Sequence, residues 1–139
     1  MSTATLGVCL SLAAALQGTP EVFVPVTEFT LAWTHSIEKV RWEEDYAVEL
    51  DASTRQPVLH AVQARIKGSA AGMEPPDDAV LRHGWYVYTP LIKTPAELRL
   101  TRSEFTPDYD WCMRGSCQPM SNLLASDAGI TRARACFGK

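Results

Sequence analysis

Two neighbouring segments of the chain, residues 29–37 and 42–50, place mostly apolar side chains at every second position. Because side chains alternate between the two faces of a strand, each segment is predicted to be a β-strand with one buried face. The buried faces would carry Phe29, Leu31, Trp33, His35 and Ile37 in the first strand and Trp42, Glu44, Tyr46, Val48 and Leu50 in the second. The pattern therefore predicts two antiparallel strands whose apolar stripe contains two ionisable residues.

The two ionisable residues are His35 and Glu44, and a turn at residues 38–41 would place them directly opposite each other. A buried carboxylate is costly unless it is paired, and an imidazole is a suitable partner. The pair is interpreted either as an acid–base or ligand-binding site, or as a structural contact that fixes the strand register. The same register would pair Trp33 with Tyr46, Leu31 with Val48 and Phe29 with Leu50.

Length and composition favour one globular domain with a sizeable core. The chain has 139 residues, of which 46% are hydrophobic and 21% are charged, and both fractions are ordinary for a globular protein. We expect a single domain over residues 1–139, with its core in about 5–124 and a tail at 125–139. The net charge of -3 argues against nucleic acid as the main partner, because phosphate binding requires a basic surface.

Strand-like segments recur at short spacing and are separated by turn residues. Many short strands predict an all-β fold, either an antiparallel β-sandwich or a flattened barrel. Residues 122–135 are ambiguous and could form a short helix. Besides the two strands above, the expected strands are residues 5–12, 22–26, 58–66, 85–89 and 97–103, followed by a late hairpin. In residues 58–66 the expected buried stripe is Val58, His60, Val62, Ala64 and Ile66.

The apolar run at residues 6–16 has three interpretations. Its alternation favours a strand, whereas its apolar character leaves a signal peptide or a membrane anchor as alternatives. No Lys or Arg precedes the run and no clear cleavage site follows it, so the strand is preferred. No segment reaches the roughly 18 apolar residues that a membrane-spanning helix requires.

The four cysteines have interpretations that depend on the compartment. If residues 114–115 form a two-residue turn, Cys112 lies opposite Cys117 at a spacing that suits a disulfide. Cys9 and Cys136 could form a second bridge, although no local pattern supports it. In a reducing compartment all four would be thiols. A zinc site is a further alternative at the edge of the usual ligand spacing, and no metal or cofactor is predicted.

Two further features complete the candidate ligand-binding set. The loop at residues 68–76 contains two glycines, and it is either a shaped connection or a rim whose backbone amides bind an anion. Ser36 follows His35 but points to the opposite strand face, and no G-x-S-x-G motif surrounds it, so a turn role is preferred over a nucleophile. The candidate residues are His35, Ser36, Trp42, Glu44, Tyr46, Gly68 and Gly72.

Residues 29–46 carry the most specific resemblance to a known family. The His35–Ser36 pair, followed by an acidic and an aromatic residue in the next strand, resembles the bacterial domain of unknown function 1850 family. The glycine-rich residues 68–76 and the cysteines at 112 and 117 are also similar to that family, so the likeness covers roughly residues 6–124. Members of the family are often encoded beside TRAP transporters with a TAXI-class receptor. The resemblance therefore implies a transport-linked accessory or binding role. The compartment stays open between the periplasm, which this association suggests, and the cytoplasm.

The leading hypothesis is a non-enzymatic accessory or small-ligand-binding module associated with TRAP-type solute uptake. His35 and Glu44 would line its pocket with residues 68–76 at the rim, and its partners would be transporter components or a small organic acid. One alternative is an enzyme that uses the His35–Glu44 pair as acid and base on a small organic acid. Another is a purely structural domain that binds a protein partner. An open pocket beside the pair distinguishes the first two hypotheses from the third.

Overall fold

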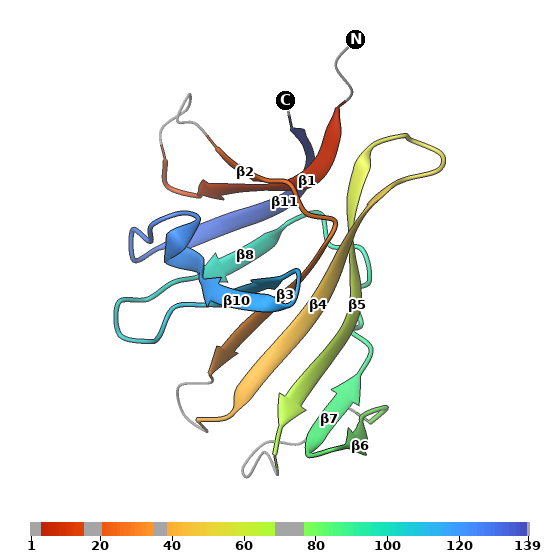
Figure 1. Cartoon of the computed structure of the whole chain (residues 1–139), viewed down its shortest axis with the longest axis vertical. Helices are drawn as coiled ribbons and strands as arrows, with labels where there is room; N and C mark the ends of the chain where they lie inside the picture. Colours follow the sequence, from red (N-terminus) through yellow and green to blue (C-terminus); the bar gives the residue numbers. More distant parts are fainter. Residues whose placement is uncertain (1–3, 16–20, 35–38, 69–76, 139) are drawn as a thin grey trace.

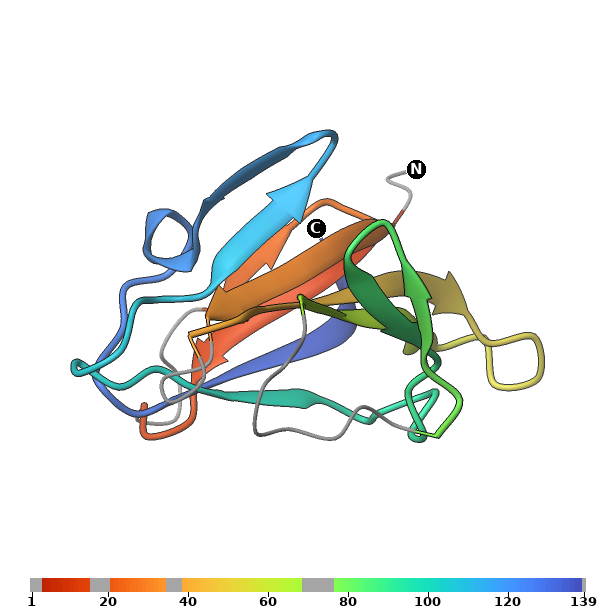
Figure 2. The same cartoon turned by 90° about the horizontal axis from the view of Figure 1, so that it is seen from below.

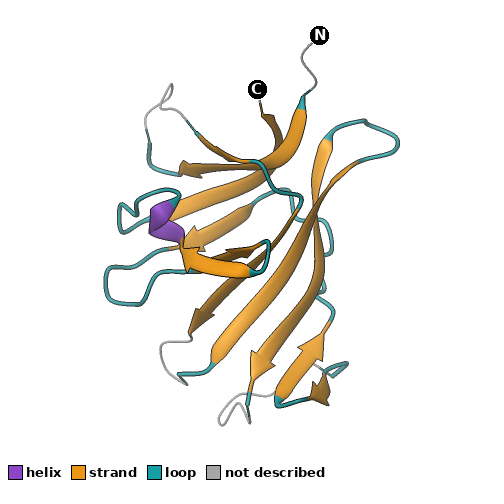
Figure 3. Ribbon diagram, viewed as in Figure 1, coloured by secondary structure: helices purple, strands orange, loops and turns teal. Residues whose placement is uncertain are grey.

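The computed structural model describes residues 4–15, 21–34, 39–68 and 77–138. They form eleven β-strands and one short 3₁₀ helix, and Figure 3 shows how far strands dominate the chain. No helix within these ranges is long and apolar enough to cross a membrane. The elements are β1 (Thr5–Leu12), β2 (Val22–Val24), β3 (Glu28–Thr34), β4 (Arg41–Leu50), β5 (Pro57–Lys67), β6 (Val80–Arg82), β7 (Trp85–Tyr88), β8 (Leu98–Thr101), β9 (Asp110–Met113), β10 (Ser116–Pro119), η1 (Met120–Asn122) and β11 (Ile130–Gly138).

The strands build two antiparallel sheets that pack against each other (Figures 1 and 2). The smaller sheet has four strands in the order β2-β1-β11-β8, and the larger has seven in the order β10-β9-β3-β4-β5-β7-β6. Within the described residues each sheet ends in two edge strands and does not close on itself. The predicted all-β sandwich is therefore confirmed, and the flattened barrel is not the form that the chain adopts.

The register between β3 and β4 differs from the predicted one by four residues. The predicted pairing of His35 with Glu44 is wrong, because Glu44 pairs with Leu31. β3 ends at Thr34 and β4 begins at Arg41, so the two strands are further apart in the sequence than the expected four-residue turn allows. An even shift keeps each side chain on its own face of the sheet. The observed pairs are Leu31 with Glu44, Phe29 with Tyr46 and Trp33 with Trp42.

A β-bulge in β5 changes the buried stripe of that strand. Asp45 pairs with Gln63, but the next residue, Tyr46, pairs with Ala61, so Val62 is the extra residue. Val62 is 48% exposed. The bulge exchanges the two faces of the strand, and the predicted stripe is therefore wrong at Val58, His60 and Val62. The buried residues of β5 are Leu59, Ala61, Ala64 and Ile66.

The C-terminal segment belongs to the core and is neither a tail nor a helix. Within residues 125–139, β11 pairs with β1 on one side and with β8 on the other. Its residues alternate, because Thr131 and Ala133 are buried while Arg132 and Arg134 form ion pairs on the opposite face. The predicted short helix is wrong, since this period of two is that of a strand and η1 covers only three residues.

Two disulfides join strands at separate places in the fold. Cys9–Cys136 links β1 to β11, and Cys112–Cys117 links β9 to β10 across the predicted two-residue turn. Both residues of that turn, 114 and 115, have positive φ angles, as a tight hairpin requires. With each sulfur bonded to another sulfur, no cysteine thiolate is left for the zinc alternative.

Candidate ligand-binding cavity

The inner face of the larger sheet is closely packed at one end. Trp111 of β9 stacks on Phe29 of β3, with ring centroids 4.3 Å apart and planes 5° apart. Phe29 in turn stacks on Tyr46 of β4 at 5.3 Å. Leu31 and Met120 complete this cluster, and both are fully buried. We call the region formed by Phe29, Leu31, Trp111 and Met120 the aromatic half.

Two small residues lie in the middle of the inner face of β5, between the larger buried residues Leu59 and Ile66. They are Ala61, opposite Tyr46, and Ala64, opposite Glu44, and each contributes a single methyl group. We call the region around these two residues the alanine half. One row of cross-strand partners crosses both halves and places Glu44 between them: Trp111, Leu31, Glu44, Ala64 and Tyr88.

A cavity of about 850 Å³ opens in the alanine half. Ala61 of β5 lines it, and the methyl group of this residue leaves space that a ring would fill in the aromatic half. The apolar part of its wall, as far as the structure describes it, consists of Ala61, Pro90, Leu91, Ile92, Pro95 and Leu98. The polar part consists of Glu44, Tyr46, Asp77, Asp78, Tyr88 and Thr89.

The segment 89–97 forms one side of this cavity and is fixed at two points. β7 pairs with β5 only from Ala64 onward, so the preceding part of β5 takes this segment as its neighbour. The backbone N–H of Ala61 donates to the carbonyl oxygen of Lys93 at 2.7 Å. Glu97 accepts a hydrogen bond from Arg132 of β11 at 2.7 Å. The wall is therefore attached to both sheets.

Glu44 is held at the cavity by a neighbour on its own strand. The Tyr46 hydroxyl donates to Glu44 Oε1 at 2.6 Å. Burial, together with the negative charge of Glu44, raises the pKa of Tyr46 far above its ordinary value. The phenol therefore stays protonated and remains a donor, which fixes the orientation of the carboxylate.

The rim of the cavity carries further acidic groups. Asp78 accepts a hydrogen bond from the backbone N–H of Thr89 at 3.2 Å, which fixes the carboxylate beside the end of β7. Burial raises the pKa of Tyr88, and the negative charges of Glu44 and Asp78 raise it further. Both tyrosines of the wall therefore stay neutral across the physiological pH range.

The predicted site residues are only partly brought together. Glu44 and Tyr46 line the cavity, whereas Trp42 stacks on Trp33 at 5.9 Å. Gly68 follows the end of β5 with a φ of 77°, and its N–H donates to Gly84 O at 2.7 Å, which fits a shaped connection. The predictions for His35, Ser36 and Gly72 lie outside the described residues.

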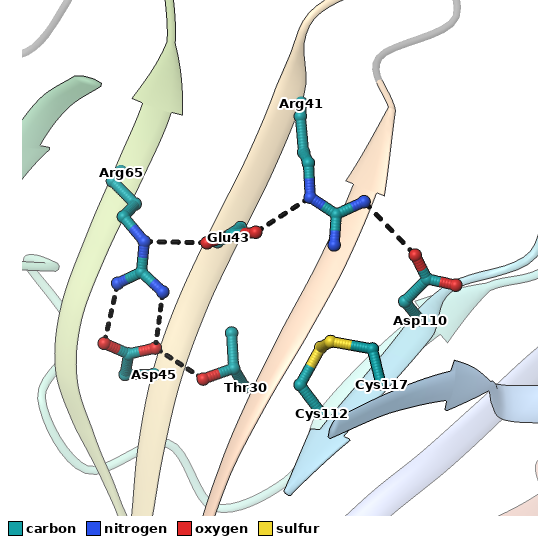
Figure 4. Close-up of a disulfide and its surroundings, with 8 residues drawn as sticks. All are labelled: Thr30, Arg41, Glu43, Asp45, Arg65, Asp110, Cys112 and Cys117. Carbon is teal, nitrogen blue, oxygen red and sulfur yellow. Dashed lines mark hydrogen bonds and ion pairs between the residues drawn. A yellow bond between two sulfur atoms is a disulfide. The ribbon is translucent and has the colours of Figure 1, made fainter. Parts of the chain in front are cut away.

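The opposite face of the larger sheet carries a ladder of ion pairs (Figure 4). Arg65 donates to Glu43 and Asp45, each at 2.8 Å, and Arg41 continues the ladder from Glu43 to Asp110. A recess of about 560 Å³ lies beside these groups and the Cys112–Cys117 hairpin. Because each arginine here is already paired with carboxylates, the ladder is interpreted as a structural feature of the exposed sheet face.

Sequence reasoning missed the segment that forms the cavity wall. Residues 89–97 read Thr-Pro-Leu-Ile-Lys-Thr-Pro-Ala-Glu and show no strand period. The signal that could have identified them is the Leu91–Ile92 pair between two prolines, since a loop rarely presents two large apolar residues without a reason. Leu91 is 100% exposed and Ile92 is 72% exposed. Within the described residues, no three His, Cys, Asp or Glu side chains are grouped as metal ligands.

The amino-acid sequence was compared with models of known protein families. Residues 29–120 match the model of the family described as domain of unknown function DUF1850. The chain belongs to the DUF1850 family. The matched region runs from β3 to the start of η1 and includes every described residue of the cavity wall. The cavity of this DUF1850 protein is thus built within the part that defines the family. Neither a curated protein nor a solved structure matches the chain.

Proposed function

We propose that this DUF1850 protein is a non-enzymatic module that binds a small, largely apolar molecule in the cavity of the alanine half. The observation that carries the proposal is the cavity of about 850 Å³ between Glu44 and the segment 89–97. Sites for small molecules have volumes of roughly 300–1,000 Å³ and apolar walls with a few fixed polar groups. The wall here has that composition, and its polar groups include a carboxylate with a defined orientation.

The contacts of Glu44 favour binding over catalysis. General acid–base catalysis needs a partner that exchanges protons near neutral pH. The group that contacts Glu44 is the Tyr46 phenol, which stays protonated because burial and the adjacent carboxylate raise its pKa. The enzyme hypothesis depended on a His35–Glu44 pair, and Leu31 occupies the cross-strand position opposite Glu44. Glu44 is therefore proposed as a binding group.

The proposed link between this module and solute uptake is taken from the family resemblance. The association of DUF1850 proteins with TRAP-type transporters supports a role as an accessory of uptake, which we include in the proposal. The two disulfides agree with that setting, because disulfides persist in oxidising compartments such as the periplasm. A binding module beside a transporter also needs no nucleophile or resident cofactor.

Binding of a neutral apolar probe to variants of the cavity wall tests the proposal. The probe is Nile red, whose fluorescence rises when it enters an apolar site. We expect saturable binding to the wild-type protein and a loss of at least about fivefold in affinity in Ala61→Phe, because the ring would occupy the cavity. Val62→Phe is the matched control, since the adjacent Val62 faces the outer recess instead.

The two variants separate the cavity from other apolar surfaces. Equal affinity in wild type, Ala61→Phe and Val62→Phe would show that Nile red binds elsewhere, and the proposal would fail. A loss confined to Val62→Phe would assign the ligand to the outer recess. Circular dichroism of both variants confirms that the strands are intact before affinities are compared.

A further inference from the structure

We infer that the cavity of the alanine half selects a ligand with a protonated amine attached to an apolar chain or ring, and disfavours organic acids. The inference rests on the proposed function, because it names the chemical class of the ligand for the same site. It differs from the expectation drawn from the sequence, in which a small organic acid was the ligand. Three features of the described wall support it: its charge, an available acceptor and its apolar mouth.

The first feature is the sign of the charges around the cavity. The described wall contains three carboxylates, those of Glu44, Asp77 and Asp78, and no Lys, Arg or His side chain. Lys93 belongs to the segment that forms the wall, but its exposed side chain is not part of the lining. A wall of one sign attracts the opposite charge and repels its own. An organic acid would therefore enter a site of like charge.

The second feature is a carboxylate oxygen available to a ligand. Glu44 Oε1 accepts the Tyr46 hydroxyl at 2.6 Å, and within the described residues no group bonds to Oε2. Glu44 is partly buried, so a carboxylate oxygen at this position gains from a charged donor. An ammonium group supplies such a donor together with the compensating charge. Tyr46 holds the carboxylate in place before the ligand arrives, which reduces the ordering cost of binding.

The third feature is the combination of aromatic and aliphatic surface beside the carboxylate. The rings of Tyr46 and Tyr88 lie in the wall, and ring faces attract cations. Leu91 and Ile92 leave apolar surface exposed near the mouth, where the apolar part of a ligand would cover it. An amphipathic amine matches both environments, with its charge at Glu44 and its chain along the segment 89–97.

Isothermal titration calorimetry with three probes of equal chain length tests the ligand class. The probes are n-octylamine, n-octanol and n-octanoate at pH 7, each kept below its aggregation concentration. We expect octylamine to bind about tenfold more tightly than octanol, as one charge-assisted hydrogen bond would give. Octanoate should bind more weakly than octanol, because its carboxylate would face those of the wall.

Two variants on the same strand assign the preference to Glu44. Glu44→Gln should lower the octylamine affinity about tenfold and leave octanol binding unchanged. Glu49→Gln removes an equal charge at an exposed position of β4 and should leave both affinities unchanged.

The probes distinguish failure of this inference from failure of the proposed function. If octanol and octanoate bind as tightly as octylamine, or octanoate binds most tightly, the amine preference is overturned and the binding function stands. If octylamine binds most tightly but Glu44→Gln has no effect, the assignment to Glu44 is overturned. If none of the three binds, both the inference and the proposed function fail. The comparison among probes uses the wild-type protein, so it holds even if Glu44→Gln does not fold.

Discussion

The aromatic half and the alanine half share one face of one sheet, yet the first is filled and the second is hollow. β4 contributes to both, since Tyr46 stacks on Phe29 while Glu44 borders the cavity. The difference lies in the neighbouring strands, because β3 and β9 present the rings of Phe29 and Trp111, whereas β5 presents Ala61 and Ala64 opposite Tyr46 and Glu44. The facing sheet also has four strands against seven, so a loop completes the wall at one end. Packing for stability and space for a ligand are thus assigned to different parts of the same sheet.

The largest expected effect is the loss of the central ring of the aromatic half. Trp111→Ala should lower the free energy of unfolding by about 3–5 kcal/mol, because Trp111 is 0% exposed and its removal leaves a large void. Urea denaturation followed by far-UV circular dichroism measures this change. A variant that is fully unfolded without urea agrees with the prediction.

The corresponding substitution in the alanine half should lower the free energy of unfolding by much less. Tyr88→Ala should cost only about 1 kcal/mol, because Tyr88 is partly buried and already borders a cavity. Equal losses in Trp111→Ala and Tyr88→Ala would contradict the division into a filled and a hollow half.

An effect slightly smaller than that of Trp111→Ala is expected from the ion pair that supports the aromatic half. Asp108 accepts two hydrogen bonds from Arg102, both at 2.9 Å, and one from the backbone N–H of Ser121 next to Met120. The Arg102 side chain is 1% exposed. Asp108→Ala should therefore destabilise the protein by about 3 kcal/mol, since it leaves a buried guanidinium without its partner. Glu104→Ala, at an exposed position nearby, is the control for urea denaturation.

The same ion pair predicts a pH dependence of stability. Burial raises the pKa of Asp108, but the hydrogen bonds and charge of Arg102 outweigh it and leave the pKa below its ordinary value. A lowered pKa in the folded state contributes stability above the unfolded value of about 3.9. That contribution is lost as the pH falls from about 4 through the folded pKa. As the pH falls below about 4, the free energy of unfolding should thus decline less steeply for Asp108→Ala than for the wild-type protein. Parallel curves for the two proteins would refute the assignment of this pH dependence to Asp108.

The fold class and part of the buried stripes could be predicted from the sequence because they depend on local alternation. The stripe in β4 is correct at Tyr46 and Val48, where strand pleating decides it, but wrong at Leu50, which is 38% exposed at the end of the strand. The register was not predictable in the same way, because it depends on the length of the connection between β3 and β4. The strand β11 was missed, since alternation between alanine and arginine is a weak apolar signal.

The candidate site was predicted only in part for a similar reason. Glu44 and Tyr46 could be identified because an acidic residue interrupts an apolar stripe. The cavity itself depends on the bulge at Val62 and on the segment 89–97, which lies beside β5 only after the chain has folded. Contacts of this kind join residues far apart in the sequence, and local periodicity carries no information about them.

The smallest expected effect is also the most specific test of the comparison. Ala61→Leu should change the free energy of unfolding by less than about 1 kcal/mol, because the added carbons enter existing space in the cavity. Ala133→Leu introduces the same carbons at a fully buried position of the core cluster and should cost about 1–3 kcal/mol. Both are measured by urea denaturation under the same conditions. A cost for Ala61→Leu equal to that for Ala133→Leu would mean that the alanine half closes in solution, and the space assigned to a ligand would not exist.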